Sequence, residues 1–319
     1  MDIIKGTNIQ FISKRKKFYQ ASGIIILIGI ISLLFQGFNY GIDFSGGTLL
    51  QLDFEQNASV TEIRAVLGEM NLAGSTIQSL SGNEIMIRTG QISLEQREGI
   101  LEKIEDRIGP FEILKIEMVG PVIGESLKRL ALFAIIFAFI GIIAYITIRF
   151  EFKFALSSIV ALAHDVLVTV GVLSIMQKEI SIPIVAGILT IVGYSINNTI
   201  VIFDRLRENL KLKSHPALGE LIDLSINQTL TRTINTALTT LLPILVLYLF
   251  GGTLSDFAFV LLIGLAVGTY SSVCIAGPLL LELKKKRERL AKPGTHVNMS
   301  KKEKRVEVKK TKVNDKKKK

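Results

Sequence analysis

The sequence predicts a polytopic α-helical membrane protein with six transmembrane helices and an extracytoplasmic α+β domain between helices 1 and 2. The 319 residues have a mean hydropathy of +0.44 and are 49% hydrophobic, which is too apolar for an ordinary soluble domain. Several apolar runs reach the roughly 20 residues that cross a hydrocarbon core about 30 Å thick. Lys and Arg residues, finally, cluster in alternate connections between these runs.

The predicted spans and their connections divide the whole chain. The six spans are residues 18–38, 127–148, 154–176, 182–203, 231–250 and 256–282. The connections are an N-terminus (1–17), an extracytoplasmic domain (39–125), a loop (204–230) and a basic tail (284–319). Because the number of spans is even, both termini lie on the same side of the membrane.

The positive-inside rule predicts that this side is the cytoplasm. Basic residues flank the first span at Lys14–Lys17, and they recur in the 149–153 and 204–230 connections and at the start of the tail. The opposite loops, Gln177–Glu179 and Gly251–Thr253, carry little charge. The N-terminus, the 204–230 loop and the tail are therefore predicted to be cytoplasmic.

The net charge of +10 belongs to the tail and does not indicate a nucleic-acid-binding protein. Residues 284–319 hold 17 basic and 4 acidic residues, so the rest of the chain has a net charge of −3. With few apolar residues, the tail is predicted to be disordered. It could attract anionic lipid or ribosomal RNA. Retention of topology and solubility is the simpler interpretation of such a charge run.

The exported segment 37–125 holds 14 acidic and 6 basic residues. Its pattern predicts strands and helices in the order βαββαβ, a split βαβ or ferredoxin-like unit. Ser59 is a candidate N-cap, with Glu62 three residues later. The predicted elements are, in order, residues 48–54, 59–70, 76–80, 84–88, 93–108 and 111–119.

Polar residues inside the spans are the candidate functional residues, because polar groups are expensive in a membrane. His164 and Asp165 lie near the middle of the third span, and Asn197 and Asn198 lie in the fourth. Arg232 enters the fifth span from the cytoplasmic side. We expect these three spans to bring their polar faces together in the cytoplasmic half of the bundle.

Each candidate also has a simpler interpretation. Arg232 could snorkel to the interface, and Asn197 and Asn198 could form interhelical hydrogen bonds worth about 0.6 kcal/mol. For His164 and Asp165, no spacing supports a metal site, so a structural or proton-handling Asp165 is favoured over a ligand.

Three further sequence patterns limit the classes of function that the chain can have. Gly264-x-x-x-Gly268 in the sixth span fits close helix packing. Cys274 lies in an apolar run and is expected to act as a small buried hydrophobe. No nucleotide-binding or nucleophilic-elbow motif is present, so we expect no cofactor, no metal and no enzymatic activity, with energy supplied by an ion gradient or a partner.

Four ordered motifs resemble the SecF family of membrane proteins. The segment Gly41-Ile42-Asp43-Phe44-Ser45-Gly46-Gly47, which could otherwise be a tight turn leaving the membrane, resembles a signature shared by SecD and SecF. Segments 161–165, 193–205 and 228–233 are similar to further SecF motifs, in order and at suitable spacing. The resemblance covers about residues 10–285.

The resemblance implies a subunit of the SecDF complex, which belongs to the resistance–nodulation–division superfamily. Such a subunit pairs with a SecD-like chain and assists protein export through the SecYEG channel, using the proton motive force of the bacterial inner membrane. The implied partners also include YajC, exported polypeptides and membrane lipids, and no nucleic acid is required. Arg232 matches an arginine linked to proton passage. The family's acidic residue in the fourth span falls on Asn198, which cannot titrate.

Two other classes of function compete with this one. A related transporter of the same superfamily would move lipids or small molecules, and a scaffold would only stabilise a SecD-like partner. The small single exported domain argues against a drug pump. A neighbouring gene for a SecD-like chain would distinguish the three.

Overall fold

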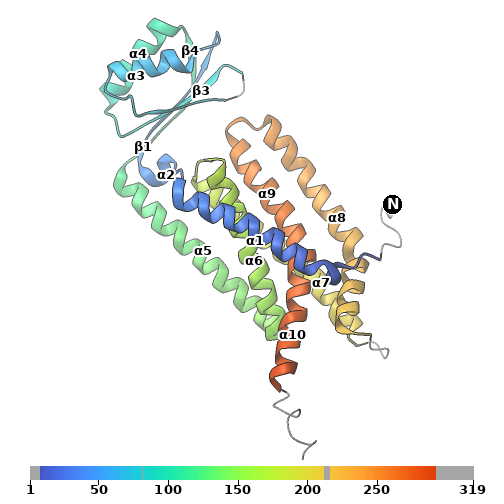
Figure 1. The fold of residues 1–319 in the computed structure, drawn as a ribbon. Helices are drawn as coiled ribbons and strands as arrows, with labels where there is room; N and C mark the ends of the chain where they lie inside the picture. The colour runs from blue at the N-terminus through green and yellow to red at the C-terminus, as the bar shows by residue number, and fades with distance from the viewer. Residues whose placement is uncertain (1–7, 81, 212–215, 292–319) are drawn as a thin grey trace, which may run out of the picture.

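The computed structural model describes residues 8–80, 82–211 and 216–291. Within these, six helices are long and apolar enough to cross a membrane. A small antiparallel sheet with two helices lies between the first and second of them (Figure 1). The predicted fold class of six membrane helices with an inserted α+β domain is therefore confirmed. Residues 292–319, most of the predicted tail, lie outside the described residues.

Beyond the α+β domain, the helices follow the apolar runs and extend past most of their ends. They are α1 (Phe11–Gln36), α5 (Pro121–Arg149), α6 (Phe152–Ile175), α7 (Ile182–Asn209), α8 (Leu218–Phe250), α9 (Ser255–Ser271) and α10 (Gly277–Ala291). The short 3₁₀ turn Gly252–Leu254 precedes α9, and the π-helical segment Ser272–Ala276 joins α9 to α10, so that these pieces form the sixth span.

The 204–230 segment, expected to be a loop, is mostly helical. α7 continues to Asn209 and α8 begins at Leu218. The extra turn of α7 is polar and carries ion pairs one turn apart, such as Arg205 with Glu208 at 2.7 Å. Hydropathy detects only the apolar part of a helix, so it missed these polar extensions.

The α+β domain has the predicted element order. It consists of β1 (Gly47–Phe54), α3 (Val60–Glu69), β2 (Thr76–Ser79), β3 (Glu84–Thr89), α4 (Leu94–Ile108) and β4 (Phe111–Val119). Its strands are antiparallel in the order β2-β3-β1-β4. The ferredoxin-like classification itself stays a prediction.

Helix caps and strand alternation explain why this segment folds locally. The Ser59 side chain caps α3 by accepting a hydrogen bond from the amide of Thr61. Ser93 and Gln96 form a capping box at the start of α4. On β1, Leu50 and Leu52 point to one face and are fully buried beneath α3 and α4. The other face of the sheet carries polar residues and turns toward the membrane helices.

The bundle is centred on α6, α7 and α9, which carry most of its buried residues. The GxxxG pair brings α9 against α7, as predicted. A Cβ built on Gly264 would lie 2.0 Å from the Ile191 side chain, and one on Gly268 would lie 2.9 Å from Cβ of Ser195. Neither position has room for a side chain, so the two glycines set the approach of these helices.

Candidate functional site in the transmembrane bundle

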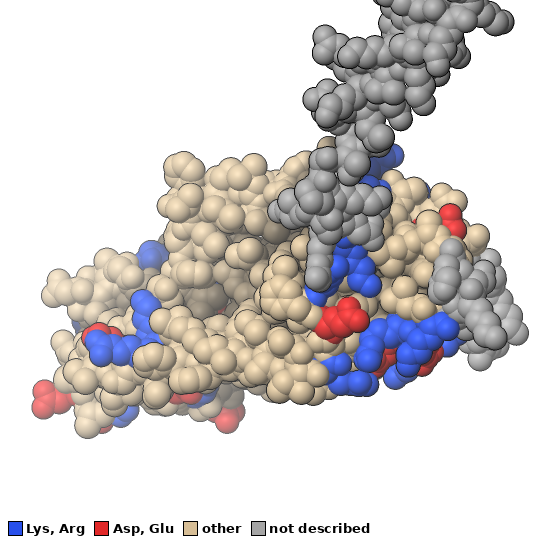
Figure 2. Space-filling model, turned by 90° about the horizontal axis from the view of Figure 1, so that it is seen from below, with Lys and Arg blue, Asp and Glu red and all other residues tan. Residues whose placement is uncertain are grey.

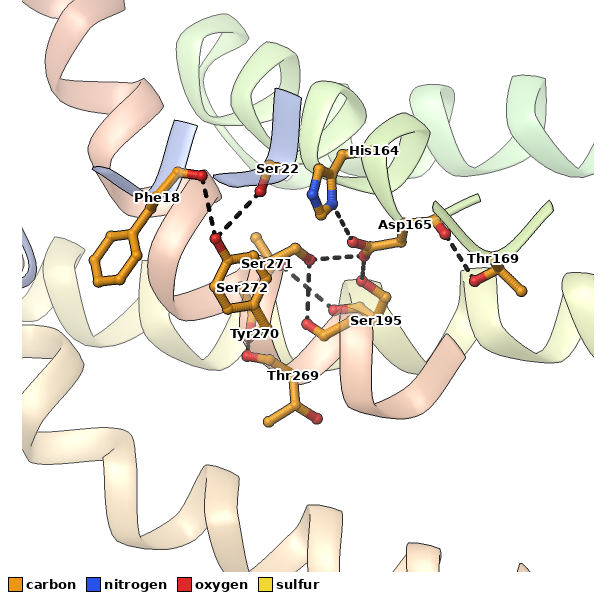
Figure 3. Close-up of polar contacts among 12 residues, drawn as sticks. Phe18, Ser22, His164, Asp165, Thr169, Ser195, Thr269, Tyr270, Ser271 and Ser272 are labelled. Atoms are coloured by element: carbon orange, nitrogen blue, oxygen red, sulfur yellow. Dashed lines mark hydrogen bonds and ion pairs between the residues drawn. The ribbon is translucent and has the colours of Figure 1, made fainter. Parts of the chain in front are cut away.

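The Asp165 carboxylate is the centre of a buried polar cluster between α6, α7 and α9 (Figure 3). Its side chain has no exposed surface. One oxygen, Oδ2, accepts hydrogen bonds from the hydroxyls of Ser195 at 2.5 Å and Ser271 at 2.7 Å. The other, Oδ1, lies 2.9 Å from Nδ1 of His164. The sequence singled out Asp165 and His164, and the structure places them together at the junction of three helices.

Local helix geometry explains how these groups meet. His164 and Asp165 are neighbours on α6, and their side chains converge because Nδ1 of the ring turns toward the carboxylate. Ser195 comes from the middle of α7, opposite Gly268, where the helices are in close contact. Ser271 is the last residue of α9, directly before the π-helical segment. An irregular turn of this kind often occurs at a functional site.

Ser271 was missed at the sequence level, and Ser195 was not chosen as a site residue. A single serine in a span is common and can hydrogen-bond to its own helix, so it gives little signal alone. The adjacent Ser271 and Ser272 in an otherwise apolar run were the available clue. Only the packing of α9 on α6 shows that Ser271 faces a carboxylate.

His164 also connects the cluster to α1. Its Nε2 atom is buried and has no hydrogen-bond partner within the described residues. The ring centroid lies 6.1 Å from that of Tyr270. The Tyr270 hydroxyl in turn lies 3.2 Å from Oγ of Ser22 and donates to the carbonyl of Phe18 (Figure 3). The polar residues therefore extend from the bundle centre to the first helix.

The structure does not bring Arg232 into this cluster. Arg232 is exposed on the surface of α8, and its side chain makes no hydrogen bond or ion pair with any described residue. The expected meeting of three polar faces therefore does not include Arg232, although Gln228 of the fifth span accepts a hydrogen bond from Arg205 of the fourth. α6 and α7 do meet, but α9 supplies the third face, because α9 and not α8 packs against Asp165.

The two asparagines of the fourth span point in different directions. Asn198 is 4% exposed, and its Nδ2 atom has no partner in the described part of the chain. Asn197 is exposed. α7 and α8 run antiparallel, with Asn209 bonded to Ser225 and Arg205 bonded to Gln228. If the same antiparallel pairing of α7 and α8 continues along both helices, Arg232 lies about one helical turn along the helix axis from Asn198.

The glycine-rich signature forms the junction between α1, the sheet and α7. Asp43 lies in the short helix α2 (Ile42–Ser45), and its carboxylate accepts a hydrogen bond from the amide of Ile182 at the start of α7, at 2.8 Å. Gly46 and Gly47 follow with φ values of 72° and 133°, which favour glycine. A Cβ on Gly47 would lie 2.4 Å from the carbonyl oxygen of Thr89. The segment is thus more than a turn, because it fixes three elements.

Cys274 is buried and unpaired, as expected of a small apolar residue. No group of three or more His, Cys, Asp or Glu side chains that could hold a metal occurs in the described residues.

Comparison with known proteins gives the family. The model of "Protein export membrane protein SecD/SecF, C-terminal" matches residues 100–286, and the SecD/SecF GG motif matches residues 31–58. A protein translocase subunit SecF of Calditerrivibrio nitroreducens is 40% identical over 91% of this chain and 99% of its own length. The SecF of Desulfurispirillum indicum is 42% identical over 86% of this chain and 91% of its own. The chain belongs to the SecF family.

Similarity to solved structures supports the assignment of the chain to the SecF family. The crystal structure of SecDF, a translocon-associated membrane protein from Thermus thermophilus, matches with a TM-score of 0.83 and 39% identity over 88% of this chain. SecDF in a super-membrane-facing form matches with a TM-score of 0.69 and 38% identity over 90%. The chain spans 39% and 40% of the lengths of those SecDF chains. It is a multi-pass membrane protein of the Sec protein-transport pathway.

Proposed function

We propose that this chain is a non-enzymatic subunit of a SecDF-type complex that assists protein export across the bacterial inner membrane. The similarity to SecF subunits over nearly their whole length carries the proposal. On this proposal the chain pairs with a SecD-like subunit, and the assembly works with the SecYEG channel and YajC on exported polypeptides. The related lipid or small-molecule transporter and the scaffold are the competing functions.

The surface of the bundle supports a partner chain. Large apolar side chains are exposed along α1, α5 and α8, for example Leu34, Phe137 and Leu245. Lipid acyl chains can cover such residues, but they cannot satisfy the charge of Arg232. A charged side chain facing hydrocarbon costs about 3 kcal/mol or more, so a counter-charge is needed if Arg232 faces away from water. In the proposed complex a carboxylate of the SecD-like subunit supplies it.

The proposed orientation places both termini in the cytoplasm and the α+β domain outside. The end of the bundle opposite that domain carries clustered Lys and Arg side chains (Figure 2). They come from the starts or ends of α1, α5, α7 and α10. This arrangement follows the positive-inside rule.

Proton coupling in this proposal depends on Arg232 together with the partner's carboxylate. Asn198 cannot bind and release a proton, but it can orient a water molecule or accept a hydrogen bond. Asp165 has three hydrogen-bond donors within this chain, which supports a mainly structural role for it. His164 holds the carboxylate from the same helix, and the exposed Asn197 has no part in the cluster.

Affinity purification of the tagged chain from mildly solubilised membranes tests the proposed assembly. We expect a SecD-like chain to co-purify at a fixed ratio and the SecY channel at a lower yield. Recovery of the chain with neither protein, at normal membrane level, would favour the independent transporter. If the SecD-like chain co-purifies, export is measured after depletion of this chain, with the SecD-like chain kept at its normal level. Unaffected export in that experiment would favour the scaffold.

A further inference from the structure

An ion pair joins the α+β domain to the membrane helices. Arg88 of β3 pairs with Glu179 in the loop between α6 and α7. Their side chains are only 12% and 13% exposed. Within the described residues, this pair is the one hydrogen bond or ion pair between residues 47–119 and residues 150–291.

Strand alternation sets the direction of Arg88. Ile85 and Ile87 face the helices of the domain and are buried in its core, so Arg88 projects from the opposite face. That face turns toward the bundle (Figure 1). It borders a cleft with a volume of about 280 Å³, lined from the bundle side by Ile182 and Phe257 among others. Arg88 thus crosses the gap between the two parts of the molecule.

The loop that carries Glu179 is itself fixed. Ile180 forms a parallel bridge with Tyr40, in which the amide of Gly41 donates to the Ile180 carbonyl at 2.9 Å. The Ile180 amide donates to the carbonyl of Asn39 at 2.7 Å. A Cβ on Gly41 would lie 2.6 Å from Oε1 of Glu179, so a side chain at this position would displace the carboxylate from its present place. Two backbone hydrogen bonds thus hold the loop that presents Glu179 to the sheet.

The geometry of the connections shows why this contact matters. The domain joins the bundle through β1 and β4, which are adjacent at one side of the sheet. Gly46 precedes β1, Gly47 is its first residue and Gly120 follows β4. Because the two connections are adjacent, they oppose rotation of the domain about the line through them less than any other motion. In the sheet, β3 lies on the side of β1 away from β4. A contact made by Arg88 of β3 is therefore a third point of attachment between the domain and the bundle, and it opposes this rotation.

The charges around Glu179 are unbalanced. It is faced by Arg88 from β3, by Asp43 from α2 and by Asp256 from α9. Lys178 of the same loop pairs with Asp256 at 2.7 Å. These groups are three carboxylates and two cations. On β4, Lys115 and Glu117 also line the cleft, and they pair with each other at 2.7 Å and add no net charge.

We propose that Arg88 is the positioning residue that fixes the exported domain over the α6–α7 loop, and that uptake of a proton by Glu179 shifts the domain toward this docked state. The position of the junction on the outer side of the membrane rests on the proposed function. The contact itself does not depend on that orientation.

The sign of the pH effect follows from the surroundings of Glu179. Burial raises the pKa of this carboxyl above its ordinary value of 4.5, Arg88 lowers it, and Asp256 and Asp43 raise it, with a raised pKa as the result. The docked state therefore binds the proton more tightly than a state in which Glu179 is exposed. By linkage, this contribution to docking is fully present below pH 4.5 and is lost as the pH rises through the raised pKa.

The two partners of the pair should consequently respond differently to substitution. Arg88→Met leaves three carboxylates facing one cation, Lys178, and should release the domain. Glu179→Gln removes the surplus negative charge, and its amide oxygen can still accept from Arg88, so the domain should stay docked. Arg88→Met/Glu179→Gln should be less damaging than Arg88→Met alone. Removing one partner of a buried pair is strongly destabilising, because it leaves an uncompensated charge.

Distance measurement between spin labels tests the proposal on the purified full chain in detergent. Labels replace the exposed Glu102 on α4 and the exposed Thr253 before α9, in a Cys274→Ser background. We expect one narrow distance distribution for the parent and a second, longer population for Arg88→Met, with the undocked-to-docked ratio raised about tenfold or more. Arg88→Lys keeps the charge and should stay docked.

The matched control is Arg107→Met, since Arg107 pairs with the exposed Glu69 inside the domain at 2.7 Å. It should leave the distribution unchanged. In Arg88→Met the longer population should shrink when the pH falls from about 7.5 to about 4.5, whereas Arg88→Met/Glu179→Gln should show no such change. If Arg88→Met behaves like Arg107→Met, Arg88 does not position the domain. If acidification enlarges the longer population, the proposed effect of the proton has the wrong sign. Neither result depends on export activity, so the proposed function is tested separately.

Discussion

At the scale of single residues, the intramembrane carboxylate and the intramembrane arginine lie in different environments. Asp165 is enclosed by donors from three helices, whereas Arg232 is exposed on α8. Hydrogen bonds from two hydroxyls and an imidazole compensate much of the cost of burying a carboxylate. The Arg232 guanidinium has no such compensation from the described residues of this chain. The residue that needs a partner is therefore the arginine.

Substitutions at these positions should separate the two roles in cells that depend on the complex. Arg232→Ala is expected to reduce proton-driven export about tenfold, because the proposed counter-charge of the partner loses its cation.

Asp165→Asn is expected to reduce export less, since an amide oxygen still accepts from the cluster. Asn198→Asp should be tolerated, because the Asn198 Nδ2 donates to no described residue and Arg232 lies about one turn away. Export of a secreted reporter, normalised to membrane level, is the measurement.

Asn197→Ala is the control for the fourth span, since Asn197 is exposed and next to Asn198. It should leave export unchanged. Full activity of Arg232→Ala would support snorkelling of Arg232 to the interface. A larger loss for Asp165→Asn than for Arg232→Ala, with normal assembly, would place the proton route in the third span of this chain.

At the scale of secondary-structure elements, the α+β domain has its own core. Fully buried side chains from β1, α3, β3 and α4, among them Leu52, Ile63, Ile87 and Ile100, pack together without help from the bundle. Burial of such side chains contributes about 1.5–3 kcal/mol each, relative to exposure. The domain therefore meets the main requirement for independent folding.

We expect residues 47–120 to fold alone as a soluble α+β domain. Circular dichroism should show a mixed helix and strand spectrum with a cooperative thermal transition. Leu52→Asp, which buries an unpaired charge in the core, should abolish that transition and serves as the control. A mainly helical or unfolded spectrum of the parent domain would show that the domain needs the bundle.

At the scale of the whole molecule, charge and fold agree on one orientation. The α+β domain lies at one end of the bundle, and basic side chains gather at the other (Figures 1 and 2). A folded domain of this size must lie wholly on one side of the membrane. The positive-inside rule supports the proposed orientation, in which that side is the outer side of the cytoplasmic membrane.

Impermeant thiol labelling of intact cells checks this orientation, after permeabilisation of the outer membrane if one is present. In a Cys274→Ser background, cysteine in place of the exposed Glu102 should be labelled. Cysteine in place of Ser300, which lies outside the described residues, should be labelled only after the inner membrane is lysed. Labelling of position 300 in intact cells would overturn the proposed topology.

Features that depend on local sequence pattern were predictable without the structure. The length of an apolar run decides whether a helix can span a membrane, and alternation or a 3.6-residue period decides strand or helix. The order of strands and helices in the α+β domain was therefore predictable, as was the close packing at Gly264 and Gly268. Polar helix extensions, such as the end of α7, carry no hydropathy signal and were missed.

The packing of the elements against one another determines which side chains meet. Asp165 and Ser271 are 106 positions apart, and Arg88 and Glu179 lie in different parts of the molecule. The sequences of the apolar membrane helices α6 and α9 do not determine the rotation of each helix about its own axis. The rotation is fixed by packing, through contacts such as Gly268 against Ser195. For that reason the sequence predicted that the polar faces of the third, fourth and fifth spans meet, whereas α9 and not α8 packs against Asp165.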